Sequence, residues 1–198
     1  MKYKINAIIL ASGFSKRMGC NKLTLPYRGK LIIENLVDEI LKIKFNEVIL
    51  LYRDEAVKKV LEYKPIYLVQ NHNAERGMSQ SIKLGVANSS ACDGYMFFVG
   101  DQINLKEELI LKLIHSFEKD IKSIVVPLYN GERGNPVIFP VEFKEKLLEL
   151  SGDKGGRVII DEFKHRVCYV NIKEKSLGID IDTEDEYVKN CIEKGELS

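Results

Sequence analysis

Residues 5–22, INAIILASGFSKRMGCNK, join the apolar run INAIIL directly to a loop that carries two glycines and three cations. An apolar run of this length before a glycine-bearing loop predicts a buried strand that opens a βαβ unit. Gly13 lets the backbone approach a ligand closely, and backbone N–H groups in such a turn form a concave set of donors. Arg17 and Lys22 can add charge-assisted bonds. The stretch therefore indicates a site for a phosphate-bearing ligand.

The spacing within this loop matches neither of two common phosphate-binding fingerprints. Gly13 and Gly19 flank five residues and Lys22 follows three positions later, so neither GxxxxGK[ST] nor GxGxxG is satisfied. A solvated basic loop is the alternative from these features alone. Local charge favours a ligand, because residues 1–33 contain seven Lys or Arg and no Asp or Glu, whereas the whole chain nets only +1. We expect a compact, anionic partner.

Composition excludes several classes of protein. The chain has 198 residues, of which 45% are hydrophobic and 30% charged, as expected for one soluble globular domain. A pI near 7.6 gives no surface-wide attraction for nucleic acid. The four cysteines show no CxxC or Cys/His spacing, which predicts four free thiols in a reducing cytoplasm. No apolar stretch reaches 18 residues, so we expect no membrane segment.

Apolar runs of strand length alternate with segments of helical periodicity. The predicted strands are residues 5–11, 48–52, 66–70, 95–99, 123–128 and 166–172. The predicted helices are residues 33–41, 55–63, 79–87, 110–117 and 143–150, a short helix after the turn SGDKGG, and a last helix after Thr183. Such alternation predicts an α/β fold with a mostly parallel central sheet and helices on both faces. Ligands of such sheets bind at the carboxyl ends of the strands.

Asp101 follows the strand predicted at residues 95–99. An Asp at such a position can cap a helix. Asn104 and Glu107, however, have the spacing of a capping box for the next helix, which would leave Asp101 in the crevice at the sheet edge. A carboxylate there suits Mg²⁺, which binds one or two carboxylates together with substrate phosphate oxygens.

A second acidic segment, IDIDT, ends at Thr183. Thr183 and Glu186 fit a capping box for the last helix, so Asp180 and Asp182 precede that helix as candidates for the second metal ligand. The alternative is that these acids only complement the dipole at the helix start.

Six segments together resemble one family of enzymes. They are LASGFSKRMGCNK at residues 10–22, Asn71 with Gly77 and Ser79, VGD at 99–101, RGNP at 133–136, SGDKGGR at 151–157 and DIDT at 180–183. The chain resembles the nucleotidyltransferases that complete molybdenum cofactor, and it is most similar to their cytidylyltransferase branch. The resemblance spans about residues 5–188.

This resemblance implies a Rossmann-like nucleotidyltransferase fold in a single domain, residues 1–198, with a nucleotide-binding half at 1–128 and an acceptor-side half at 129–198. The implied nucleotide-binding residues are Leu10, Ala11, Ser12, Gly13, Ser15, Arg17, Gly19, Lys22, Asn71, Gly77, Ser79 and Ser81. The implied acceptor-binding residues are Gly134, Asn135, Pro136, Gly152, Asp153 and Arg157. The implied catalytic residues are Arg17, Lys22 and Asp101, and the implied ligands of Mg²⁺ are Asp101 with Asp180 or Asp182. Local structure offers alternatives, because Asn71 also suits a turn, Ser79 or Ser81 a helix cap, and the glycines turns.

The implied reaction is transfer of CMP from CTP to the terminal phosphate of molybdopterin, with Mg²⁺ and release of pyrophosphate, and a molybdenum hydroxylase as recipient of the product. Two positions depart from the branch pattern, since Ser12 replaces the second Ala of LAAG and Asn135 replaces the His of GHP. The guanylyl branch resembles LAGG with Asp before Lys. Ala11, Ser12 and Asn21 are closer to the cytidylyl pattern, and Ser12 leaves less room for a purine, so we expect CTP.

Other functions stay open. Guanylyl transfer to the cofactor, or nucleotidyl transfer to a sugar or isoprenoid phosphate, would use residues 10–22 and Asp101, and a sugar or isoprenoid acceptor would not need residues 151–157. A non-catalytic carrier would use the same basic loop to bind mature cofactor without turnover. Such a carrier would bind the pterin regardless of CTP and Mg²⁺.

Overall fold

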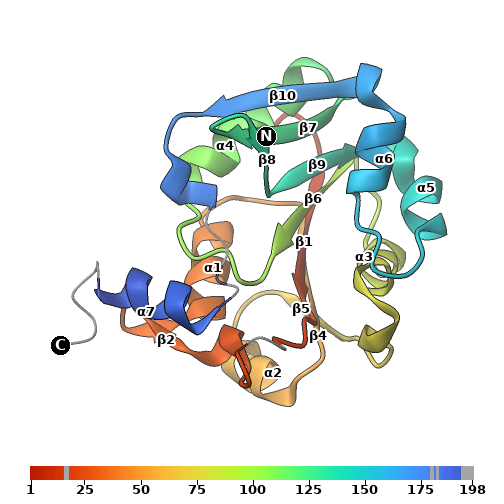
Figure 1. Cartoon of the computed structure of the whole chain (residues 1–198). Coiled ribbons are helices and arrows are strands. Elements are labelled where there is room, and N and C mark those ends of the chain that lie inside the picture. The colour runs from red at the N-terminus through yellow and green to blue at the C-terminus, as the bar shows by residue number, and fades with distance from the viewer. Residues whose placement is uncertain (16–17, 179–180, 182, 193–198) are drawn as a thin grey trace.

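Eight strands form one sheet at the centre of the part of the chain that the structure describes, residues 1–15, 18–178, 181 and 183–192 (Figure 1). The structure is a computed structural model. The strand order is β10-β7-β9-β6-β1-β4-β5, and β8 pairs with β7. The strands are β1 Ile5–Ala11, β4 Glu47–Tyr52, β5 Tyr67–Gln70, β6 Gly94–Val99, β7 Ile124–Tyr129, β8 Glu132–Arg133, β9 Val137–Pro140 and β10 Val167–Ile172.

The sheet is mostly parallel, as predicted. β1 lies between β4 and β6 and runs parallel to both, and the pairs β4–β5 and β7–β10 are also parallel. β9 is antiparallel to β6 and β7, and β8 is antiparallel to β7. The sequence analysis missed β8 and β9, because β9 has only four residues and follows a turn-rich segment that hides its pattern. Strands from both predicted halves of the chain lie in this sheet.

Helices cover both faces of the sheet (Figure 1). One face packs against α1 Ile32–Leu41, α2 Glu55–Leu61 and α4 Glu107–Lys119, and the other packs against α3 Met78–Ala87, α5 Lys144–Glu149 and α6 Arg157–Glu162. Successive residues of a strand point to opposite faces. Ile9 therefore joins the core beneath α1 and α4, whereas Ile8 joins the core beneath α3. Burial on both faces explains why β1 reads as a continuous apolar run.

A smaller cluster joins the hairpin of β2 Pro26–Tyr27 and β3 Lys30–Leu31 to the segment before α7 Glu184–Ile192. Its buried members are Tyr27, Ile32, Ile103 and Ile181. The remaining described helices are the 3-10 turns η1 Lys22–Thr24, η2 Ala74–Arg76, η3 Val141–Phe143, η4 Lys164–Arg166 and η5 Lys175–Gly178.

The predicted capping box at the start of α7 is confirmed. The Thr183 backbone N–H donates to Glu186 Oε2 at 2.9 Å, and the Glu186 N–H donates to Thr183 Oγ1 at 3.3 Å. Thr183 and Glu186 thus cap the start of α7 together.

The predicted capping box at Asn104 and Glu107 is wrong. α4 begins at Glu107, and its N-cap, Lys106, makes no side-chain cap bond. Asn104 instead lies buried under the β2–β3 hairpin, where its Oδ1 accepts bonds from the Tyr27 hydroxyl at 3.1 Å and from Arg28 Nη2 at 3.0 Å. The Asn104 side chain thus bonds to residues that are distant in sequence and does not cap α4.

Membrane and thiol features can be stated for the described residues. None of their helices is both long enough and apolar enough to cross a bilayer. Cys20, Cys92 and Cys168 are free thiols, as predicted, and the side chain of Cys191 lies outside the described part.

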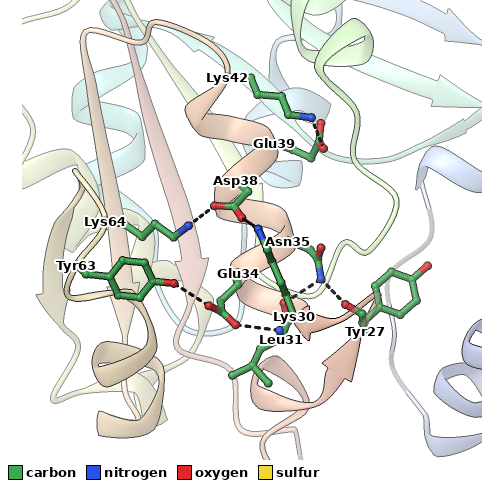
Figure 2. A network of polar contacts seen from close by, with 10 residues as sticks. All are labelled: Tyr27, Lys30, Leu31, Glu34, Asn35, Asp38, Glu39, Lys42, Tyr63 and Lys64. Atoms are coloured by element: carbon green, nitrogen blue, oxygen red, sulfur yellow. Dashed lines mark hydrogen bonds and ion pairs between the residues drawn. The ribbon is translucent and has the colours of Figure 1, made fainter. Parts of the chain in front are cut away.

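Asp38 ties helix α1 to two neighbouring segments (Figure 2). Its carboxylate forms ion pairs with Lys30, at 2.5 Å, and with Lys64. Glu34, one turn earlier, accepts a hydrogen bond from the Tyr63 hydroxyl at 2.8 Å. The exposed side of α1 is thus fixed to β3 and to the chain that follows α2.

We expect Asp38→Asn to destabilise the protein in a pH-dependent way. Burial raises the pKa of Asp38, but the hydrogen bonds and charges of Lys30 and Lys64 outweigh burial, so the pKa lies below its ordinary value. Because the pKa of Asp38 is lower in the folded state, its ion pairs contribute their full stability above the unfolded-state pKa, about 4. This contribution is lost as pH falls through the folded-state pKa. The loss should be about 1 kcal/mol at pH 7 and smaller at pH 3. Urea unfolding at both pH values measures it, and equal losses would contradict the expectation.

Candidate functional site

A pocket of about 430 Å³ lies at the carboxyl ends of β1 and β6. Its walls come from the loop after β1, from the start of α3 and from the end of β6. Of the predicted site residues, those that line it are Leu10, Ser12, Gly13, Ser15, Lys22, Gly77, Ser81, Asp101 and Asp153. Those predicted for the nucleotide that do not line it are Ala11, Gly19, Asn71 and Ser79. Arg17 lies outside the described residues.

Lys22 and Asp101 form an ion pair in this pocket, with side chains only 11% and 20% exposed. Lys22 Nζ also donates to the carbonyl oxygen of Ile181 at 2.6 Å, and the Ile181 N–H donates to the carbonyl oxygen of Asp101 at 3.2 Å. Three segments that are distant in sequence therefore converge on one point. Asp180 and Asp182, the predicted second metal ligands, lie outside the described residues, but Ile181 between them is anchored here.

The loop after β1 is fastened to the end of β4. Ser12 Oγ donates to the carbonyl oxygen of Leu51 at 3.0 Å, and Asn21 Nδ2 donates to Asp54 Oδ2 at 2.8 Å. The N–H of Ala56 and then the Asn21 amide lower the pKa of Asp54, which keeps this acceptor ionised. These bonds hold both ends of the loop and therefore limit where its N–H groups can point.

Two further contacts shape the middle of this loop. Ser15 has a positive φ of 48°, which non-glycine residues rarely adopt, and its Oγ accepts a bond from the Lys22 N–H at 3.3 Å. The guanidinium carbon of Arg53 lies 4.5 Å from the centroid of the Phe14 ring, in a cation–π contact. The loop is thus supported by the Ser15–Lys22 bond within the pocket lining and by Arg53, which follows β4.

Asn71 supports the opposite wall from behind. It is buried, its Nδ2 donates to Ser81 Oγ at 3.0 Å, and its Oδ1 accepts from the Asn73 N–H at 3.1 Å. The turn role is thus the observed one. The prediction that Ser79 or Ser81 caps α3 is wrong, because α3 begins at Met78 after Gly77 and has no side-chain cap bond.

A second pocket, of about 390 Å³, adjoins the first and shares Leu10, Met78, Val99 and Asp153 with it. The predicted acceptor-binding residues that line it are Gly134, Asn135, Asp153 and Arg157, whereas Pro136 and Gly152 do not. Most of its remaining lining is apolar, from Ile82, Phe97, Val126, Val137, Phe139, Leu147 and Ile160. Part of each predicted set of residues thus lines one of two neighbouring pockets.

The lining residues that the sequence analysis did not assign to the site include Phe14, Met78 and Arg133. Phe14 lines the first pocket, Arg133 lines the second, and Met78 lines both. Arg133 forms an ion pair with Asp161 at 2.7 Å. The Arg of RGNP was the available signal for Arg133, whereas nothing in the local pattern distinguishes Phe14 or Met78 from core residues.

The donor chemistry of the first pocket fits a hard divalent cation. Among the described residues, no group of three or more His, Cys, Asp or Glu could hold a metal ion. Mg²⁺ needs only one or two carboxylates when substrate phosphate oxygens and water complete its ligands. Asp101 meets that requirement, since its carboxylate lies in a pocket whose other groups suit phosphate.

Comparisons with known proteins agree with this geometry. The sequence model of the family described as MobA-like NTP transferase domain matches residues 7–167. A protein of Paenarthrobacter nicotinovorans named nicotine blue oxidoreductase is 26% identical over 188 residues, 90% of this chain and 92% of that protein. The molybdenum cofactor cytidylyltransferase of Escherichia coli K12 is 25% identical over 93% of this chain and 94% of its own length.

Two further proteins are similar to this chain: a relative named as a guanylyltransferase and a protein of known structure. A probable molybdenum cofactor guanylyltransferase of Natranaerobius thermophilus is 30% identical over 66% of this chain and 63% of its own length. The crystal structure of Rv0371c from Mycobacterium tuberculosis H37Rv has a TM-score of 0.86 at 25% identity, over 94% of this chain and 96% of that one. The predicted nucleotidyltransferase fold and the family resemblance are confirmed.

We expect Gly77→Ala to strain the wall between the two pockets. Gly77 has a φ of +94°, and a Cβ there would lie 2.5 Å from Asp153 Oδ1 and 2.6 Å from the Gly152 carbonyl oxygen. Relieving that strain should cost about 1–3 kcal/mol of unfolding free energy. Urea unfolding measures the loss. Gly13→Ala is the matched control, because a Cβ there meets no atom of the described residues within 4 Å, and equal losses in the two variants would contradict the expectation.

Proposed function

Because this chain belongs to the family of MobA-like NTP transferase domains and is a nucleotidyltransferase, we propose that it transfers CMP from CTP to the terminal phosphate of a molybdopterin-type acceptor. The observation that carries the proposal is the meeting of Lys22 and Asp101 in a pocket that adjoins a second, more apolar pocket. In this proposal pyrophosphate is released, and the product passes to a molybdenum hydroxylase in the cytoplasm.

The first pocket supplies groups for a triphosphate. Lys22 offers a cation, and Gly13 exposes backbone with open space around it. Arg17 would add a second cation from the same loop. Held against these groups, the α-phosphate would be aligned for in-line attack, and positioning of this kind accounts for much of the catalysis in such transfers.

Asp101 would hold Mg²⁺, together with Asp180 or Asp182. When bound, the ion neutralises charge on phosphoryl oxygens. In the structure Asp101 is paired with Lys22, so a substrate must replace this contact: the lysine would turn to phosphate and the carboxylate to the cation. No general base is required, because the terminal phosphate of the acceptor is already ionised when it attacks.

Two contacts support a pyrimidine base. Ser12 is 5% exposed and its hydroxyl is bonded to the Leu51 carbonyl oxygen, so its side chain occupies space that a glycine would leave open to a purine. Asn21 donates a hydrogen bond to Asp54. An Asp at position 21, as in the guanylyl pattern, would place a second negative charge beside Asp54, and the two carboxylates would repel each other. The guanylyltransferase relative keeps GTP as the alternative.

The second pocket supports a ring-bearing anionic acceptor. Its apolar walls offer surface for a flat ring system, and Arg133 and Arg157 at its lining offer cations for a phosphate. Asn135, in place of the usual His, lines the same pocket. A sugar or isoprenoid phosphate is the alternative acceptor, whereas membership of a transferase family disfavours the non-catalytic carrier.

Pyrophosphate release tests the reaction and its base together. We expect molybdopterin with Mg²⁺ and CTP to give a kcat/KM at least tenfold above that with GTP, ATP or UTP, and we expect EDTA to abolish release. A preference for GTP would assign guanylyl transfer. Turnover only with sugar or isoprenoid phosphates would replace the acceptor. One relative is named an oxidoreductase, so absence of release with every nucleotide and acceptor would show that this fold serves another reaction here.

We expect Lys22→Ala to lower kcat/KM about ten- to a hundredfold, because loss of a charge-assisted bond to phosphate removes roughly 1.5–3 kcal/mol. Steady-state kinetics with CTP and acceptor measure the effect. Lys30→Ala is the matched control, since Lys30 is also a cation of the N-terminal segment but pairs with Asp38 on α1. Wild-type kinetics in Lys22→Ala would remove this lysine from the site.

A further inference from the structure

Gln102 is the residue after Asp101. Its side-chain NH₂ group is hydrogen-bonded, whereas its side-chain oxygen has no partner among the described residues. Gln102 is 1% exposed. Its Nε2 donates to the carbonyl oxygens of Asn135, at 3.1 Å, and Leu177, at 2.9 Å. Because both partners are acceptors, only the NH₂ group can face them. Its Oε1 is buried and has no hydrogen-bond partner among the described residues.

These two bonds join segments that belong to different parts of the site. Asn135 lines the second pocket, and its carbonyl oxygen also accepts from the Tyr129 hydroxyl at 2.6 Å. Leu177 lies in η5, four residues before Ile181, whose carbonyl oxygen binds Lys22. Gln102 therefore connects the chain beside Asp101 to Asn135 in the second pocket and to Leu177 in η5.

Close packing leaves these segments little room to move independently. A Cβ on Gly134 would lie 2.5 Å from the Tyr129 ring, and one on Gly178 would lie 2.7 Å from it. The two segments thus pack against one ring, and Gln102 bonds to a residue beside each glycine. A change at Gln102 should therefore move the segment at Asn135, in the second pocket, relative to Asp101.

We propose that Gln102 is a positioning residue, which sets the acceptor pocket at the right distance from Asp101. This inference rests on the proposed function. The unpaired Oε1 argues against a role in stability alone, because a buried acceptor without a partner offsets part of what the two donated bonds contribute. The loop after β1 has its own bonds to β4, through Ser12 and Asn21, so it does not depend on Gln102.

The test is Gln102→Met, which keeps the length of the side chain but removes both donors. Stability should fall only modestly: the Leu177 carbonyl oxygen loses its donor, but the variant also removes the unpaired acceptor, and the Asn135 carbonyl oxygen keeps its bond from Tyr129. We expect the dissociation constant of Mg²⁺–CTP to stay within twofold of wild type. We expect kcat/KM for the acceptor to fall at least tenfold.

Asn6→Leu is the matched control. Asn6 is another fully buried amide, and its Nδ2 donates to the Ser90 carbonyl oxygen at 2.8 Å near the amino end of β1, away from the site. This variant should lose stability without any change in kinetics. Tyr129→Phe is a milder second variant, which removes only one donor to the Asn135 carbonyl oxygen and should lower acceptor kcat/KM in the same direction. It tests the inference if Gln102→Met does not fold.

The outcomes separate this inference from the proposed function. Acceptor kcat/KM at the wild-type value, or an equal loss for CTP and acceptor, overturns the positioning role. If wild type releases no pyrophosphate, the proposed reaction has failed, and calorimetric binding of molybdopterin to wild type and to Gln102→Met tests the inference instead. Binding at least tenfold weaker in the variant supports it, and equal or undetectable binding in both overturns it.

Discussion

Burial of β1 on both faces and along both edges is the constraint from which the site follows. β4 and β6 flank the strand in parallel register, and the two helical layers cover Ile8 on one side and Ile9 on the other. The strand has no freedom to slip, because a shift of one residue would exchange its two faces. The position of Ser12, and with it the start of the loop after β1, is therefore fixed by the sheet.

The ion pair of Lys22 and Asp101 lowers the free-energy cost of burying these two charges at the carboxyl ends of the strands. A lone cation or carboxylate at so low an exposure would lose much of its hydration, and each group restores part of that loss for the other. The same two groups are the ones that a chelated triphosphate would hold apart. In the proposed function, substrate binding would replace this ion pair, so the same two groups would serve both the stability of the site and phosphate binding.

The sequence predicts the parts of this molecule that depend on local pattern. Continuous apolar runs identify β1, β4 and β6, and the loops that follow β1 and β6 contain the predicted residues Lys22 and Asp101. The errors occur where tertiary partners decide. Asn104 has the spacing of a cap but is bonded to Tyr27 and Arg28 of a distant hairpin, and the Ser81 hydroxyl is bonded to Asn71. Gln102 could not be recognised either, since its two partners are 33 and 75 residues away.

The antiparallel strand β9 has a consequence for synthesis of the chain. It lies between β6 and β7, so β7 and β10 reach the rest of the sheet only through residues 137–140. A ribosome that has released residues 1–128 has delivered every strand around β1 but has left one side of β6 without a hydrogen-bonded neighbour. Such an open edge can pair with another nascent chain. The interval until β9 emerges is therefore one in which a chaperone that covers this edge would prevent such pairing.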